Sequence, residues 1–99
     1  MSIFDAFSFK KEAEKIFTKE NFKAILERAR AQIIEKAKLS IPGQEKKILV
    51  DEAVIAKLRE LCSKCKNKLV LWIIDQIIKI IPTVTQLVYD FLKEKVENL

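Results

Sequence analysis

Hydrophobic residues recur along this chain every three or four positions, the spacing that places them on one face of an α-helix. The period-two alternation typical of β-strands appears nowhere in the sequence. Helical spacing covers residues 3–17, 19–39, 44–64, 69–81 and 84–99. The pattern therefore predicts an all-α fold, a compact bundle of four to five mostly antiparallel amphipathic helices joined by short loops.

Capping residues, prolines and the single glycine mark the expected helix ends. Ser2 is placed to cap the first helix, and Thr18 to cap the second. The segment Ser40-Ile-Pro-Gly is the clearest break, and Pro42 suits the first turn of the helix that follows. Pro82 either opens a new helix or kinks one that continues through it.

Residues 69–81 form the most hydrophobic segment, LVLWIIDQIIKII, in which Asp75, Gln76 and Lys79 share one face. A helix so apolar on its other sides is expected to be buried on several faces, as the central helix of a bundle or as a membrane-inserting or oligomer-forming surface. The expected core draws on every helix after the first: Phe22, Ile25, Ile33, Val54, Leu58, Leu61, Trp72, Ile73, Ile77, Leu87, Val88 and Phe91.

Length and charge add two constraints. Ninety-nine residues suit a single helical domain, 1–99, in which the Phe-rich helix over 1–17 lies at the periphery. The formal net charge is +5, and the basic excess lies in the first two thirds of the chain. The basic patch most suited to phosphate contacts combines Lys57, Arg59, Lys64, Lys66 and Lys68.

Catalysis finds little support in the composition. The chain has no histidine, the usual general base, and one glycine, too few for a phosphate-binding loop. Its acids are scattered along polar faces, so we predict no catalytic residue and a protein that is not an enzyme. Cys62 and Cys65 have CxxC spacing without a second ligand pair, so no metal or other cofactor is expected and both thiols should pack into the core. With no secretory signal visible, we expect a cytoplasmic chain with reduced thiols.

Function must then come from the surface, and three interpretations stay open. The first is docking of an apolar helix face onto other copies or a protein partner. The second is membrane activity through the apolar helix or the Phe-rich start, and the third is nucleic-acid binding by the basic patch. Candidate interaction residues are Phe4, Phe7, Trp72, Ile73, Ile77 and Ile80.

The order of features resembles a known class of small proteins. The chain has, in order, a Phe-rich start, a Lys/Glu-rich amphipathic helix, the segment Pro42-Gly43-Gln44-Glu45-Lys46-Lys47 and a hydrophobic helix with a charged tail. This order is similar to that of lysine-rich phage-encoded proteins, some of them holin-like proteins of the LL-H type. The resemblance implies a phage protein found in the bacterial cytoplasm, in the virion or at a membrane periphery. Small bacteriocin-immunity proteins are also similar in size, charge and expected architecture.

Overall fold

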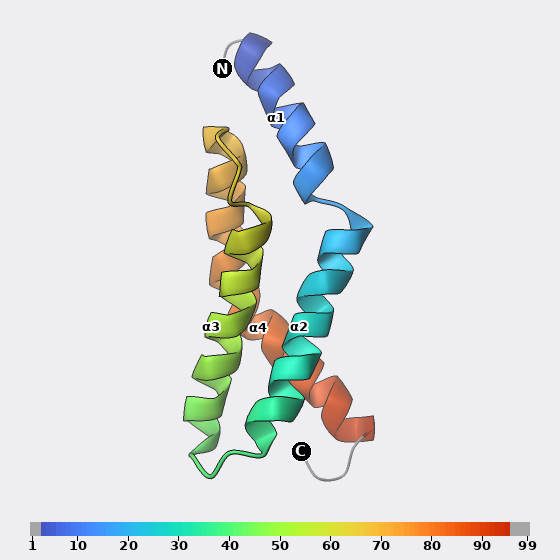
Figure 1. Ribbon diagram of the computed structural model, residues 1–99, viewed down its shortest axis with the longest axis vertical. Helices are drawn as coiled ribbons and strands as arrows, with labels where there is room; N and C mark the ends of the chain where they lie inside the picture. The colour runs from blue at the N-terminus through green and yellow to red at the C-terminus, as the bar shows by residue number, and fades with distance from the viewer. Residues whose placement is uncertain (1–2, 96–99) are drawn as a thin grey trace.

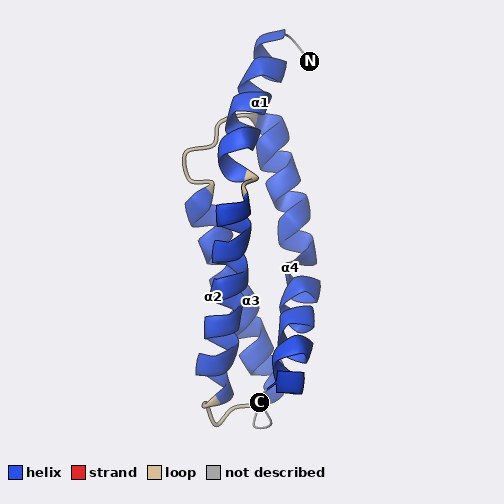
Figure 2. Ribbon diagram, turned by 90° about the vertical axis from the view of Figure 1, so that its right-hand side faces the viewer, coloured by secondary structure: helices blue, strands red, loops and turns tan. Residues whose placement is uncertain are grey.

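The computed structural model describes residues 3–95, with side chains described from Ser8 onward. Within that range the chain forms α1 (Ile3–Ile16), α2 (Lys19–Ala37), α3 (Gly43–Leu61) and α4 (Lys68–Lys95), and no strand (Figure 2). The prediction of an all-α fold is confirmed. The expected segments 3–17, 19–39 and 44–64 lie close to the bounds of α1, α2 and α3, whereas 69–81 and the described part of 84–99 belong to the single helix α4. The expected cap Ser2 lies outside the described residues.

The helices form an elongated body measuring 52 × 22 × 18 Å. In Figure 1, α1 and α2 follow one another downward, α3 returns upward beside α2, and α4 descends behind them. The most extensive packing is between α2 and α3, whereas α4 packs mainly on α3 and less on α2. This α2–α3 hairpin is the support on which α4 lies, and α1 touches the body chiefly through α4.

Side chains satisfy the helix ends that lie near the α1–α2 junction. The Thr18 hydroxyl accepts a hydrogen bond from the Asn21 backbone N–H at 3.1 Å, which confirms Thr18 as the cap of α2. The Asn21 amide in turn donates to the carbonyls of Lys15 and Ile16, at 3.2 and 2.9 Å. One short segment therefore both ends α1 and begins α2.

A carboxylate from α1 holds the start of α4. The two oxygens of Glu12 accept hydrogen bonds from the backbone N–H groups of Lys66 and Asn67, at 2.9 and 2.8 Å. The Asn67 side-chain oxygen then accepts from the N–H groups of Leu69 and Val70, at 2.9 and 3.3 Å, as an N-cap does. These contacts tie α1 to the beginning of α4.

Each of the three longer helices contributes one buried stripe to the core. The buried apolar residues are Ile25, Ala29, Ile33, Val50, Val54, Leu58, Cys62, Val70, Ile74, Ile81 and Leu92. Four residues predicted to lie in the core are instead exposed: Phe22 (63%), Trp72 (58%), Leu87 (64%) and Phe91 (60%). The apolar faces of α2 and α4 are wider than the area that three packed helices cover, so their edges stay at the surface.

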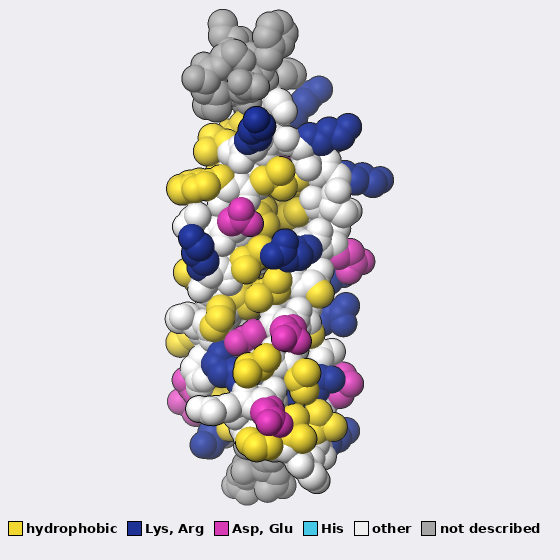
Figure 3. Space-filling model, turned by 90° about the vertical axis from the view of Figure 1, so that its left-hand side faces the viewer, with side chains coloured by type: hydrophobic (Ala, Val, Ile, Leu, Met, Phe, Trp, Pro, Cys, Tyr) yellow, Lys and Arg dark blue, Asp and Glu magenta, His cyan; other side chains and the backbone are white. Residues whose placement is uncertain are grey.

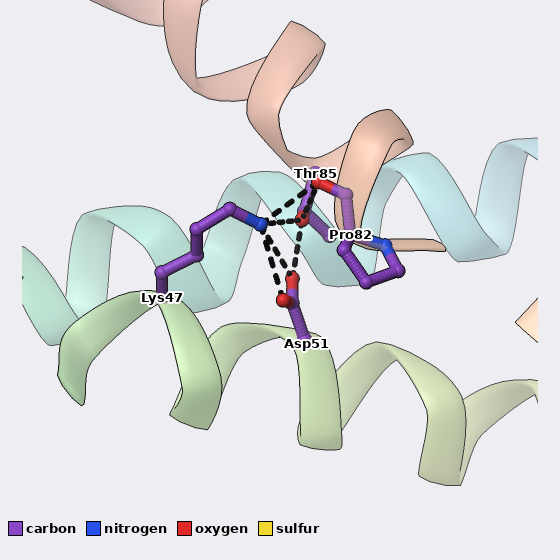
Figure 4. Close-up of polar contacts among 4 residues, drawn as sticks. All are labelled: Lys47, Asp51, Pro82 and Thr85. Carbon is purple, nitrogen blue, oxygen red and sulfur yellow. Dashed lines mark hydrogen bonds and ion pairs between the residues drawn. The ribbon is translucent and has the colours of Figure 1, made fainter. Parts of the chain in front are cut away.

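Helix α4 continues through Pro82, one of the two alternatives expected from the sequence, and its axis changes direction near the middle (Figure 1). Polar side chains of α3 meet it there. The Lys47 ammonium donates to the Pro82 carbonyl at 2.8 Å and to Asp51 at 3.1 Å, and the buried Thr85 hydroxyl donates to Asp51 (Figure 4). This cluster fixes α4 against α3 at the point where proline interrupts the helical hydrogen bonding.

We predict that Asp51→Ala lowers the free energy of unfolding by about 1–3 kcal/mol, because it removes the carboxylate that accepts from the buried Thr85 hydroxyl and the Lys47 ammonium and leaves them the Pro82 carbonyl alone to share. Urea unfolding followed by circular dichroism measures this. Glu52→Ala, an exposed carboxylate one position along α3, is the control and should change the midpoint little. Equal effects of the two substitutions would contradict a specific role for the Asp51 cluster.

Candidate interaction surface

The apolar surface of α4 extends well beyond its contact with the body. Its buried residues are Val70, Ile74, Ile81, Thr85 and Leu92, which lie along one stripe. Only 22% of its most apolar 18-residue stretch is buried. The alternative in which this helix is the central, covered helix of a bundle was therefore wrong, whereas the membrane-inserting and oligomer-forming alternatives stay predictions. By length and composition alone, α4 is also the one helix in the described range that is long and apolar enough to cross a membrane.

A second apolar stripe runs beside the buried one. It consists of Ile73, Ile77, Ile80, Val84, Leu87 and Phe91, which we call the α4 seam. The steps between successive members alternate between four and three residues, the spacing of a coiled-coil contact line. Ile80, Leu87 and Phe91 are 54%, 64% and 60% exposed, so most of the outer edge of the seam faces solvent.

The middle of the seam forms one wall of an apolar groove, which we call the α2–α4 groove. Its volume is about 250 Å³, and Phe22 and Leu26 of α2 line it opposite Ile77, Ile80 and Val84 of α4. Leu58 and Leu61 of α3 also line it, and Asn21 is its one polar lining residue within the described range. Because contiguous exposed apolar surface of this kind is uncommon on monomers, the groove and seam together mark a candidate contact surface.

The structure brings together only part of the predicted interaction set. Ile73, Ile77 and Ile80 lie in the seam, but Trp72 does not. Helical geometry puts Trp72 on the side of α4 that carries Asp75 and Lys79, three and seven positions further along. The side chains of Phe4 and Phe7 lie outside the described residues.

Sequence reasoning missed the lower half of the seam. Val84, Leu87 and Phe91 extend the line begun by Ile73, but Leu87 and Phe91 were assigned to the core. The signal that would have found them is the unbroken alternation of four- and three-residue steps across Pro82. This alternation is easily overlooked because a proline usually ends a helix, so residues before and after Pro82 are read as two helices.

Charged side chains are mixed with apolar ones on the face beside α3. In Figure 3, hydrophobic side chains occur along the length of the face that α3 and α4 present, with Lys, Arg, Asp and Glu side chains among them. The predicted basic patch follows the end of α3, the next loop and the start of α4. Arg59, Lys64, Lys66 and Lys68 are exposed there, while Lys57 is half-buried and pairs with Glu60 at 3.7 Å.

A larger cavity, of about 530 Å³, lies at the opposite end near the α2–α3 turn, and three lysines line it. Each already has a partner: Lys36 pairs with Glu35 at 3.6 Å, Lys46 donates to the Ala37 carbonyl at 3.2 Å, and Lys47 binds Asp51. Lys46 therefore satisfies a carbonyl at the end of α2, and Lys47 holds α3 against α4.

Both cysteines are free and pack as predicted, Cys62 within the core and Cys65 against it. Burial, followed by the neighbouring Cys65 sulfur, raises the pKa of the Cys62 thiol to about 11. Burial, followed by the Glu12 carboxylate, also raises the pKa of Cys65. Raised pKa values favour the protonated thiol, the less reactive form.

Among the described residues, no group of three or more Cys, Asp or Glu side chains is placed to hold a metal ion.

Comparison with known proteins supplies no relative. No protein-family model matches the chain, and neither a curated protein nor a solved structure matches it. The functional argument therefore depends on the geometry of the molecule itself.

The raised pKa predicts slow alkylation of Cys62 in the folded protein. A pKa of about 11 against an ordinary value of 9.0 leaves about a hundredfold less thiolate at pH 8. Peptide mapping after iodoacetamide treatment should show Cys62 alkylated at least a hundredfold more slowly in buffer than in urea. The native rate should rise steeply between pH 9 and 11.

The same shift gives a stability contribution that is complete below pH 9 and is lost as the pH rises toward 11, because the folded state holds its proton more tightly. The stability difference between wild type and Cys62→Ala should shrink over that range. Fast native alkylation of Cys62 at pH 8 would contradict its burial.

Proposed function

We propose that this chain is a non-enzymatic interaction protein that binds an apolar helix of another polypeptide along the α4 seam and the α2–α4 groove. The described helices would act as a compact, mostly antiparallel bundle that presents this surface. We also propose that it acts in a phage-encoded assembly, and the support for that part is the resemblance to small lysine-rich phage proteins. The single observation that carries it is the exposure of the seam beside an almost wholly apolar groove.

The geometry favours a helix as the bound element. A line of apolar side chains at alternating four- and three-residue steps matches the knobs and holes of a second helix. The groove runs between two helices and has apolar walls, as in the helix-in-groove mode of recognition. Burying Ile80, Leu87 and Phe91 against such a partner would contribute favourably because each now exposes more than half of its surface.

Ile80→Glu tests the proposal, with Ile48→Glu as a matched control. Ile80 and Ile48 are 54% and 55% exposed, so the two substitutions place the same charge at equally open positions, one in the seam and one on α3. A tagged chain is expressed in bacterial cells beside an untagged copy and cross-linked. Every captured polypeptide is then quantified by mass spectrometry.

Wild type should retain at least one polypeptide in near-stoichiometric amount, either another copy or a different chain. Ile80→Glu should reduce that amount at least tenfold because it places a charge in an apolar contact, and Ile48→Glu should leave it unchanged. Matching helical circular dichroism spectra would show that all three proteins fold. Equal capture by Ile80→Glu and wild type, or no such capture by wild type, would overturn the proposal.

Membrane association is a second candidate, supported by the length and low burial of α4. Helices that lie in a lipid surface carry polar faces rich in Lys and Arg. The polar face of α4 mixes both signs, since residues 68–95 contain four lysines and three acids. Flotation with anionic vesicles decides between the candidates: a protein-binding surface predicts no lipid-bound fraction, whereas a membrane-active protein predicts one that Ile80→Glu reduces.

A further inference from the structure

We infer that the helix received by the α4 seam is the α4 of a second copy of this chain, running in the opposite direction about a two-fold axis near Thr83. The inference rests on the proposed function and names its partner. It depends on how the seam, its polar edge and the groove are arranged around α4.

The seam residues follow a heptad pattern. One set of contact positions holds Ile77, Val84 and Phe91, and the other holds Ile73, Ile80 and Leu87. Every one of these positions is apolar from residue 73 to residue 91, and most carry β-branched side chains, a composition typical of helices that pair in small numbers. A surface with this repeat is suited to a second helix that carries the same repeat.

The seam is self-complementary when the two helices run in opposite directions. Centring the pair between Ile80 and Val84 places Ile80 of each copy opposite Val84 of the other. The next layers then pair Ile77 with Leu87 and Ile73 with Phe91. Each layer combines two apolar side chains, and each contact occurs twice, as a two-fold interface requires.

The polar edge of the seam selects the antiparallel direction. Gln76, Thr83 and Asp90 follow one edge, and the α2–α4 groove opens along the other. In a parallel pair, the polar edge of one copy would lie over the apolar groove of the other and bury the Asp90 carboxylate. The Gln86 amide donates to that carboxylate at 3.0 Å but is neutral and leaves its charge uncompensated, which is costly. In an antiparallel pair, the polar edges of both copies meet at the solvent side and the grooves meet at the inner side.

Contacts along that polar edge are favourable as well. The two-fold axis brings Thr83 of both copies face to face and places Gln76 opposite Asp90, where the amide can donate to the carboxylate. Charge does not oppose the pairing, because residues 68–95 carry four lysines and three acids despite the net +5 of the chain. The basic excess lies mostly on α2 and in the loops on either side of α3.

The most exposed apolar side chains of the seam and groove supply part of the area that a dimer interface needs. Phe22, Ile80, Leu87 and Phe91 are 63%, 54%, 64% and 60% exposed. They present on the order of 400 Å² per copy, or about half of the roughly 800 Å² that each partner buries in a standard interface. Partly exposed seam and groove residues, with the Gln76–Asp90 edge, would supply the rest.

Light scattering on the purified chain, without lipid or detergent, tests the pairing. Wild type should have twice the 11.5 kDa mass of one chain across a concentration series and at high salt. Ile80→Glu should shift the dimer dissociation constant at least a hundredfold toward monomer, and Ile48→Glu should not shift it. A wild-type monomer, a larger assembly, or a dimer that Ile80→Glu leaves intact would overturn the inference.

Disulfide cross-linking tests the direction of the pair. Thr83→Cys should form a covalent dimer on mild oxidation, because the two copies meet at that position. Gln76→Cys alone should stay at the wild-type background, whereas a mixture of Gln76→Cys and Asp90→Cys chains should cross-link. Cross-linking by Gln76→Cys alone but not by Thr83→Cys would overturn the antiparallel arrangement.

The two tests separate this inference from the proposed function. A monomeric purified chain that still captures a different polypeptide, with loss in Ile80→Glu, would overturn the second copy as partner and leave the helix-binding function standing. A monomer whose captured set does not depend on Ile80 would overturn both.

Discussion

The central constraint on this molecule is that α4 has a wider apolar arc than the α2–α3 hairpin can cover. Two helices side by side bury roughly one stripe of a third helix, and the stripe they bury here runs from Val70 to Leu92. The seam lies beside that stripe and is left at the surface. The groove against α2 follows from the same geometry, since α4 packs mainly on α3.

Polar contacts determine where α4 lies on its support. The Glu12 carboxylate and the Asn67 cap fix its first turn, and the Lys47–Asp51–Thr85 cluster holds it where Pro82 interrupts its hydrogen bonding. Apolar packing is non-directional and would tolerate rotation of α4 about its axis. Hydrogen bonds at two points along the helix limit that rotation, so they also determine which apolar side chains face outward.

This division of roles connects stability to the proposed function. The residues that hold α4 lie on its α3 side and at its start, while the residues proposed to bind a partner lie on its open side. Substitutions at the exposed seam residues Ile80, Leu87 and Phe91 should therefore alter binding with little effect on the fold, and substitutions in the Asp51 cluster should do the reverse.

Sequence alone determined the helices, because their apolar periodicity, the Thr18 cap and the break before Gly43 are local properties of the chain. It also predicted that Cys62 and Cys65 would pack in or against the core, as they do. Its choice of Ile73, Ile77 and Ile80 as contact residues stays a prediction. Only the tertiary structure decided which apolar residues are covered. Leu87 and Leu92 both have helical spacing, yet Leu87 is 64% exposed and Leu92 is 6% exposed. This difference in exposure depends on the number and position of the neighbouring helices, and the local pattern of apolar residues does not specify either.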